Sequence, residues 1–232
     1  MDLEILNKIE IPSIDSLNGI SSEEKPDDTN DRHICENKQR SVCIEITPKY
    51  EYRRAFSEVS LLNALNAPGF DFKPGHCYNF ITAGDIDSLS FLKAIIRQQD
   101  LDYLLASTWC MSAQDIAQFR LWVEEGKIKK MDFYLGEIFH GSYGLEYNLL
   151  KSIYDDYPDL GRMAIFRNHS KVFAGTGKKF PFAIQGSANI NTNPRTEQAA
   201  IIIDEGLFLF YKDYYDGIIS FEKTKKTEEQ SI

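Results

Sequence analysis

From residue 75 onward, short apolar runs alternate with segments whose apolar residues recur at helical spacing. Short runs rich in β-branched and aromatic residues predict strands, and the intervening segments of about 10 to 15 residues predict helices. The pattern predicts strands at residues 76–83, 101–109, 130–135 and 162–166, and helices at 88–98, 112–125 and 143–154. Strands that alternate with helices indicate an α/β fold, a mixed, largely parallel sheet with helices on both faces.

Outside this region the pattern is different. Before it we expect a short strand at residues 41–47 and a helix at 56–65; after it, a hairpin of two strands at 170–173 and 182–185, a buried strand at 199–203 and a closing helix at 207–221. Residues 21–31 are polar and charged and offer little apolar surface to bury. We therefore divide the chain into an acidic, partly disordered segment (1–47), an α/β domain (48–222) and a polar tail (223–232).

The charge of the chain is unevenly distributed. Its net charge of -9 argues against a surface coated for nucleic-acid binding. Residues 1–47 hold eleven acidic and five basic residues, whereas residues 161–200 hold six basic residues and Glu197 as the single acid. The basic region is therefore suited to an anionic ligand, although such a patch also occurs on ordinary surfaces.

Other sequence features concern compartment and metals. No run of about 18 apolar residues is present, and the first residues lack the features of a signal peptide, so we expect a cytoplasmic protein without membrane contact. Four cysteines occur without a CxxC pair, which is typical of buried thiols rather than of a metal site.

Candidate chemistry lies within thirty residues. His169 and Lys171 are two residues apart in a predicted strand, so their side chains share a face. The segment Gly186-Ser187-Ala188-Asn189 lets the backbone approach a ligand and adds neutral hydrogen-bonding groups. A carboxylate at Glu197 can orient an imidazole. A base or nucleophile, a cation, neutral donors and a carboxylate are the groups that a phosphodiester site needs.

These residues resemble the signature of the phospholipase D superfamily, HxK followed by GSxN and often by an Asn and a Glu. The matches are His169-Ser170-Lys171, Gly186-Ser187-Ala188-Asn189 and the stretch from Asn193 to Glu197. More weakly, the chain is similar to phospholipase D-like proteins of bacteriophages and mobile elements. One departure is that Thr176 stands where the motif has a supporting Asp, which puts local stability and turnover in question.

The resemblance implies a metal-independent phosphodiesterase without a cofactor, in which one histidine attacks phosphorus and a second protonates the leaving oxygen. The catalytic residues would be His169, Lys171, Ser187, Asn189 and Glu197. Of the four histidines, only His169 is followed by a lysine two residues later. We therefore expect a homodimer whose two copies of His169 share one active site.

Single-motif members of the superfamily are typically nucleases, so DNA or RNA is the expected substrate. We expect Arg167, Lys178, Lys179 and Arg195 to hold a phosphate backbone, and Glu137 to line the cleft. Trp109 and Tyr134, near strand ends, are typical either of core positions or of stacking on bases. Three alternatives stay open: His169 as an ordinary surface histidine, a non-catalytic nucleic-acid-binding or structural module on the same fold, and a phospholipid phosphodiesterase or phosphatidyltransferase.

Overall fold

The computed structural model describes residues 42–190 and 195–221. Most of the predicted disordered segment, the polar tail and Asn193 lie outside these ranges. The expected strand at 41–47 is wrong where it is described, because residues 42–48 have no regular secondary structure. The sheet edge is instead formed by β1 (Lys49–Ala55), and Ile46 packs against the core beneath the last helix.

The sheet has eight strands in the order β1-β2-β8-β7-β6-β3-β4-β5. The other strands are β2 (His76–Thr82), β3 (Leu101–Thr108), β4 (Met131–Gly136), β5 (Met163–Phe166), β6 (Val172–Gly177), β7 (Pro181–Gly186) and β8 (Glu197–Ile202). The α/β class and the mixed sheet are confirmed. The expectation of a largely parallel sheet is wrong, because four of the seven pairings between these strands are antiparallel.

The reason is the position of the hairpin. Strands β6 and β8 run against the other six and lie inside the sheet, so each makes antiparallel pairings on both sides. The carboxyl ends of β1 to β5 and of β7 therefore meet the amino ends of β6 and β8 at one edge. We call this the carboxyl edge; its loops come from many parts of the chain.

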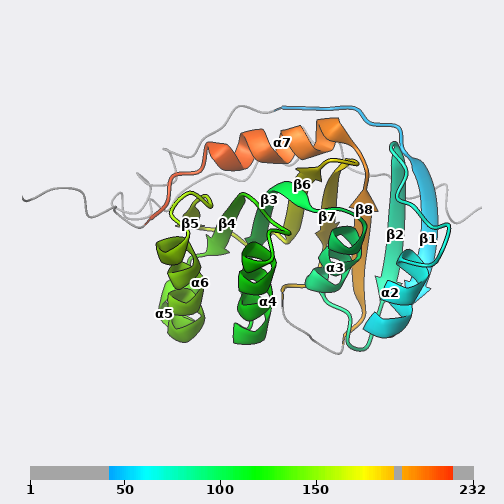
Figure 1. Ribbon diagram of the computed structural model, residues 1–232. Helices are drawn as coiled ribbons and strands as arrows, with labels where there is room; N and C mark the ends of the chain where they lie inside the picture. Colours follow the sequence, from blue (N-terminus) through cyan, green and yellow to red (C-terminus); the bar gives the residue numbers. More distant parts are fainter. Residues whose placement is uncertain (1–41, 191–194, 222–232) are drawn as a thin grey trace, which may run out of the picture. The chain divides into compact units, whose positions relative to one another are not determined.

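Helices cover both faces, as predicted. One face carries α2 (Glu58–Leu65), α3 (Ser88–Gln98), α4 (Ala113–Glu124) and α6 (Gly144–Asp156), with the short α5 (Phe139–Ser142) before α6. The other face carries α7 (Glu205–Asp216), which packs against β6 and β7. In Figure 1, α7 runs across the top of the view, above the row of the other helices. The predicted closing helix ends five residues early, where Gly217 disfavours its continuation.

Local sequence explains where the central helices begin. Asp87 accepts a hydrogen bond from the Ser90 backbone while the Ser90 hydroxyl accepts one from the Asp87 backbone, and Ser112 and Asp115 repeat this capping box at α4. These caps satisfy backbone N–H groups that the first helical turn leaves unpaired. Helix α3 is thereby fixed with its first turn at the carboxyl edge, directly after the loop that follows β2.

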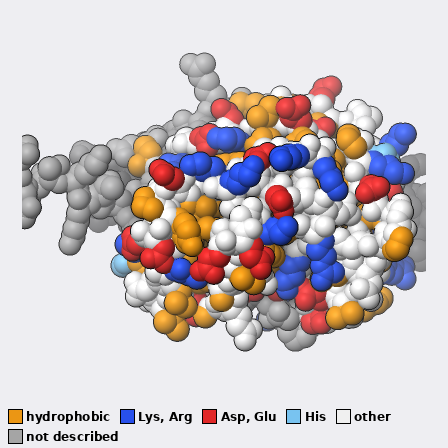
Figure 2. All heavy atoms as spheres, viewed as in Figure 1, with side chains coloured by type: hydrophobic (Ala, Val, Ile, Leu, Met, Phe, Trp, Pro, Cys, Tyr) orange, Lys and Arg blue, Asp and Glu red, His pale blue; other side chains and the backbone are white. Residues whose placement is uncertain are grey.

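The face formed by these helices carries acidic and basic side chains interleaved (Figure 2). Ion pairs join neighbouring helices there, Lys93 to Glu58 at 2.7 Å and Arg120 to Asp156 at 2.8 Å. No helix in the described part of the chain is long and apolar enough to cross a membrane. Of the cysteines expected to be buried, Cys77 and Cys110 are buried but Cys43 is exposed, because it lies in the irregular segment before β1.

Candidate functional site

His169 and Lys171 lie in the connection between β5 and β6 at the carboxyl edge. Strand β6 begins only at Val172, so the pair precedes the strand rather than forming its start. The two side chains nonetheless meet. The Lys171 Nζ lies 2.9 Å from His169 Nδ1 and donates to the His169 carbonyl oxygen at 2.6 Å. His169 is exposed and Lys171 is half-buried, so the imidazole is accessible from solvent.

The second half of the motif follows β7. The Ser187 hydroxyl donates to the Glu197 carboxylate and accepts a hydrogen bond from the Gln198 backbone at 3.1 Å. The Asn189 carbonyl oxygen accepts one from the Ser88 backbone N–H at the first turn of α3, at 3.4 Å. Glu197 therefore fixes the serine turn in this structure. Its expected role in orienting an imidazole stays a prediction.

These groups surround one cavity of about 240 Å³. Its lining contains all five predicted catalytic residues and two of the predicted binding residues: Ile86, Trp109, His169, Lys171, Ser187, Ala188, Asn189, Arg195 and Glu197. The Trp109 and His169 rings lie with centroids 5.2 Å apart at an interplanar angle of 57°. Two cations, one carboxylate, an amide and a hydroxyl thus face a space large enough for a phosphoryl group.

Burial lowers the pKa of Lys171, and the nearby Cys110 and Glu197 oppose this shift. Burial also raises the pKa of the Cys110 thiol, while Lys171 acts in the opposite direction. The lysine ammonium is therefore partly removed from water. An anion that enters such a place interacts with the cation more strongly than it would in bulk solvent, because the local dielectric response is weaker.

A buried polar network beneath the motif was not predicted. Asn168, which is 5% exposed, donates to Ser107 Oγ and to the Tyr134 carbonyl, both at 2.9 Å. Its Oδ1 accepts from the Ser170 backbone at 3.0 Å and from the Ser170 hydroxyl at 2.6 Å. Tyr215 of α7 bonds both Ser107 (2.9 Å) and Ser170 (2.5 Å). The residues on each side of His169 are thus anchored in the core.

The sequence contains a signal for this network. Asn168 and Ser170 alternate with His169 and Lys171, so an extended backbone turns the first pair inward when the second points outward. Glu137, expected to line the cleft, does not line the cavity; it supports the same segment, because its carboxylate accepts a hydrogen bond from the Asn168 backbone at 3.3 Å. Tyr134 is a core residue, fully buried, with its hydroxyl bonded to Arg162.

The structure does not bring every predicted binding residue to the cavity. Lys178 and Lys179 lie at the turn between β6 and β7, at the opposite edge of the sheet, where the Lys179 backbone bonds Gln99 at 3.0 Å. Thr176 lies near the same edge, paired with Pro181. Because strand β6 starts beside His169 and runs to the opposite edge of the sheet, its later residues lie away from the site. Arg167 is exposed at the carboxyl edge but does not line the cavity.

Gly136 at the end of β4 is a further residue that the sequence alone did not reveal. A Cβ atom there would lie 2.4 Å from Trp109 Cδ1 and 2.9 Å from the Asn168 carbonyl oxygen. The absence of a side chain therefore lets Trp109 pack between β4 and the His169 segment.

Gly136→Ala is expected to displace Trp109 and lower kcat/KM of the activity proposed below by about 10- to 100-fold, because displacements near 1 Å in a site have effects of that size. Steady-state kinetics and tryptophan fluorescence measure the two consequences. The control is Gly141→Ala in α5, where a Cβ meets no atom within 4 Å. Equal kinetics for both variants would contradict the role of this contact.

Comparison with models of known protein families finds no match to the chain. Comparison with curated proteins finds none either. Within residues 42–190 and 195–221, no three His, Cys, Asp or Glu side chains are grouped so that they could hold a metal ion. The assignment of function therefore depends on the motif and on the geometry of its cavity.

Proposed function

We propose that this protein is a metal-independent phosphodiesterase of phospholipase D type that cleaves nucleic acid, with an active site shared between two subunits. The observation that carries the proposal is the cavity at the carboxyl edge. Residues from the connection before β6, the turn after β7 and the start of β8 line it together, and they are the residues of the HxK and GSxN motif. Their meeting is a consequence of the fold.

In the proposed reaction, a ring nitrogen of His169 attacks phosphorus and forms a P–N bond while the P–O bond to the leaving group breaks. The leaving oxygen takes a proton from the imidazolium of His169 of the partner subunit. Water then attacks the phosphohistidine, the P–N bond breaks, and the proton of the water passes to the partner's His169. Each step balances without an oxidant or a metal.

The neighbouring groups have matching roles. Lys171, close to the imidazole and partly desolvated, stabilises the negative charge on the phosphoryl oxygens. The Asn189 amide and the Ser187 hydroxyl supply neutral hydrogen-bonding groups at the other side of the cavity, and Glu197 fixes Ser187. The Asn189 Oδ1 is buried without a hydrogen-bond partner among the described residues.

A second subunit supplies the acid. The chain has one HxK motif, and the exposed His169 lies in a cavity that opens at the carboxyl edge. A two-fold axis near this edge would place two copies of His169 on opposite sides of one phosphate. In a solitary subunit the leaving group would lack its proton donor.

Nucleic acid is preferred over lipid as the substrate. Trp109 offers an aromatic surface within the cavity, and Arg195 and Arg167 add positive charge at the same edge.

The second candidate is a nucleic-acid-binding module without turnover, favoured by Thr176 in place of the motif Asp. However, Thr176 lies at the far edge of the sheet, where an aspartate could not touch phosphate bound at His169.

The test is to incubate the protein with bis-p-nitrophenyl phosphate, DNA, RNA and phosphatidylcholine vesicles in EDTA, and to measure its mass by sedimentation. We expect hydrolysis of the small diester and of nucleic acid, with a dimer as the active species. Nucleic-acid binding without any hydrolysis would establish the second candidate. Cleavage of lipid alone would assign the phospholipid chemistry, and full activity of a monomer would exclude the shared site.

A further inference from the structure

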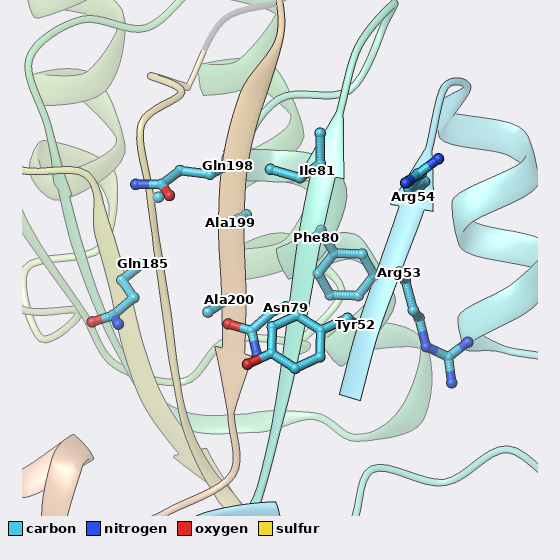
Figure 3. A pocket seen from close by; sticks show the side chains of 11 residues that line it. Tyr52, Arg53, Arg54, Asn79, Phe80, Ile81, Gln185, Gln198, Ala199 and Ala200 are labelled. Carbon is cyan, nitrogen blue, oxygen red and sulfur yellow. The ribbon is translucent and has the colours of Figure 1, made fainter. Parts of the chain in front are cut away.

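Helix α7 leaves one end of its sheet face uncovered. A groove of about 750 Å³ lies there, across the strands β1, β2, β8 and β7 (Figure 3). The side chains that matter are Tyr52, Arg54, Asn79, Ile81, Gln185 and Gln198. The uncovered end is the end of the strands that leads to the carboxyl edge, because Gln185 and Gln198 are close in sequence to Ser187 and Glu197.

The strand alternation sorts the side chains of this region. Tyr52 pairs with Asn79 and Arg54 with Ile81, so these four project to the same face. Figure 3 shows the Tyr52 ring beside the Asn79 amide. Tyr52 is 79% exposed and Ile81 is 50% exposed. These are large apolar surfaces for an exposed sheet face, and the adjacent Tyr50 ring stacks on Tyr52 with centroids 6.4 Å apart.

The charge of the groove differs from that of the whole chain. Among the described residues, its lining includes no carboxylate, whereas the protein has a net charge of -9. Arg54 is exposed at the groove. Glu51 and Arg53 flank Tyr52 in the strand, so their side chains project to the face opposite the groove. There they form an ion pair at 2.9 Å, and the Arg53 guanidinium lies over the Phe70 ring. The groove therefore presents aromatic surface, amides and one guanidinium, a combination that fits bases and a phosphate backbone.

The groove lies next to the proposed active site, because neighbouring residues of β8 and of the turn after β7 line the two. The Ser187 backbone donates to the Gln198 carbonyl at 3.0 Å, and the Gln198 backbone donates to the Ser187 hydroxyl. Glu197 faces the cavity and Gln198 faces the groove, on opposite sides of one strand. A single strand of nucleic acid is flexible enough to turn over this edge, whereas bending a duplex to the same degree costs free energy.

We infer that this groove binds an unpaired stretch of nucleic acid. The substrate class would then be single-stranded DNA or RNA. The inference rests on the proposed function. Exposed bases stack on Tyr52 and Tyr50, Asn79 and Gln198 bond base edges, and Arg54 holds a phosphate. Paired bases in a duplex have no free faces to offer these rings.

The experiment measures fluorescence anisotropy of labelled 15-nucleotide single strands and of the matching duplex, using full-length protein with His169→Ala to prevent cleavage. Adding Tyr52→Ala is expected to weaken single-strand binding by about tenfold, because stacking of one base on an aromatic ring has an effect of that order. Arg54→Gln is expected to lower the slope of log affinity against log salt by about 0.7, one phosphate contact to a single strand. The control is Tyr157→Ala, an exposed tyrosine after α6 and outside the groove, which should bind like the parent.

Unchanged single-strand affinity in Tyr52→Ala, or an equal loss for duplex, would overturn the inference. So would a parent protein that binds no single strand. A dimer that Tyr52→Ala converts to a monomer would show that this face contacts a second copy of the chain instead. Hydrolysis of bis-p-nitrophenyl phosphate by the unaltered protein is measured separately, so a failure of the proposed catalysis is distinguishable from a failure of the groove to bind nucleic acid.

Discussion

His169→Ala is expected to reduce kcat/KM for bis-p-nitrophenyl phosphate by at least about 10³-fold, in EDTA and at saturating dimer concentration. In the proposed mechanism, the substitution removes the attacking nitrogen from one subunit and the proton donor from the other, so both half-reactions would lose their group. The imidazole is exposed and lies against Trp109 and Lys171, neither of which is fully buried, so its removal should leave the thermal midpoint within a few degrees of the parent.

The matched control is His76→Ala. His76 begins β2 at the opposite edge of the sheet, and its ring lies against Tyr78 with centroids 6.0 Å apart. Loss of activity in both histidine variants would indicate a general effect on the fold rather than on the site. Retention of activity in His169→Ala would remove the phosphohistidine mechanism altogether, and trapping a phosphorylated His169 by rapid quench would support it directly.

The sequence predicted most elements because each has a local cause. The caps at Asp87 and Ser112 and the apolar period of the segments behind them place α3 and α4 within one residue of their observed starts. Strand β1 was missed because its sequence mixes Tyr with Glu, Lys and Arg. Such a polar strand is stable at a sheet edge, where one side of the strand and part of one face are exposed to solvent. Whether a segment lies at an edge depends on its tertiary neighbours, which the local sequence pattern does not contain.

The candidate site was predictable to the same degree. His169, Lys171, Ser187, Asn189 and Glu197 were correctly grouped in one cavity because the motif concentrates them within thirty residues. Lys178 and Lys179 are close to Lys171 in sequence but do not reach the cavity, because strand β6 lies between them and carries the chain to the opposite edge of the sheet. Ser107 and Tyr215 lie far away in sequence, and only the strand order brings them under the motif.

The hydrogen bonds that anchor the His169 segment come from residues far away in sequence, and removing them should have a large effect. Asn168→Ala is expected to lower the free energy of unfolding by about 2–4 kcal/mol, because it removes buried bonds to Ser107 and to the backbone of Tyr134 and Ser170, and leaves their partners unsatisfied. Urea denaturation measures this loss. Because the segment that carries His169 is then released, kcat/KM under conditions where the variant is folded should also fall.

Two further variants separate anchoring of the site from general stability. Asn66→Ala removes an asparagine whose side-chain amide donates a 2.9 Å hydrogen bond to the Leu62 carbonyl at the end of α2, and it should cost less than about 1 kcal/mol without affecting catalysis. Tyr215→Phe removes only the hydroxyl that bonds Ser107 and Ser170, and is expected to lower stability by about 1 kcal/mol and to reduce kcat more than it raises KM.

If Asn168→Ala and Tyr215→Phe lost stability while kcat stayed at the parent value, the network would be a core feature alone. A fall in kcat that follows the number of bonds removed would instead show that the buried hydroxyls position the histidine.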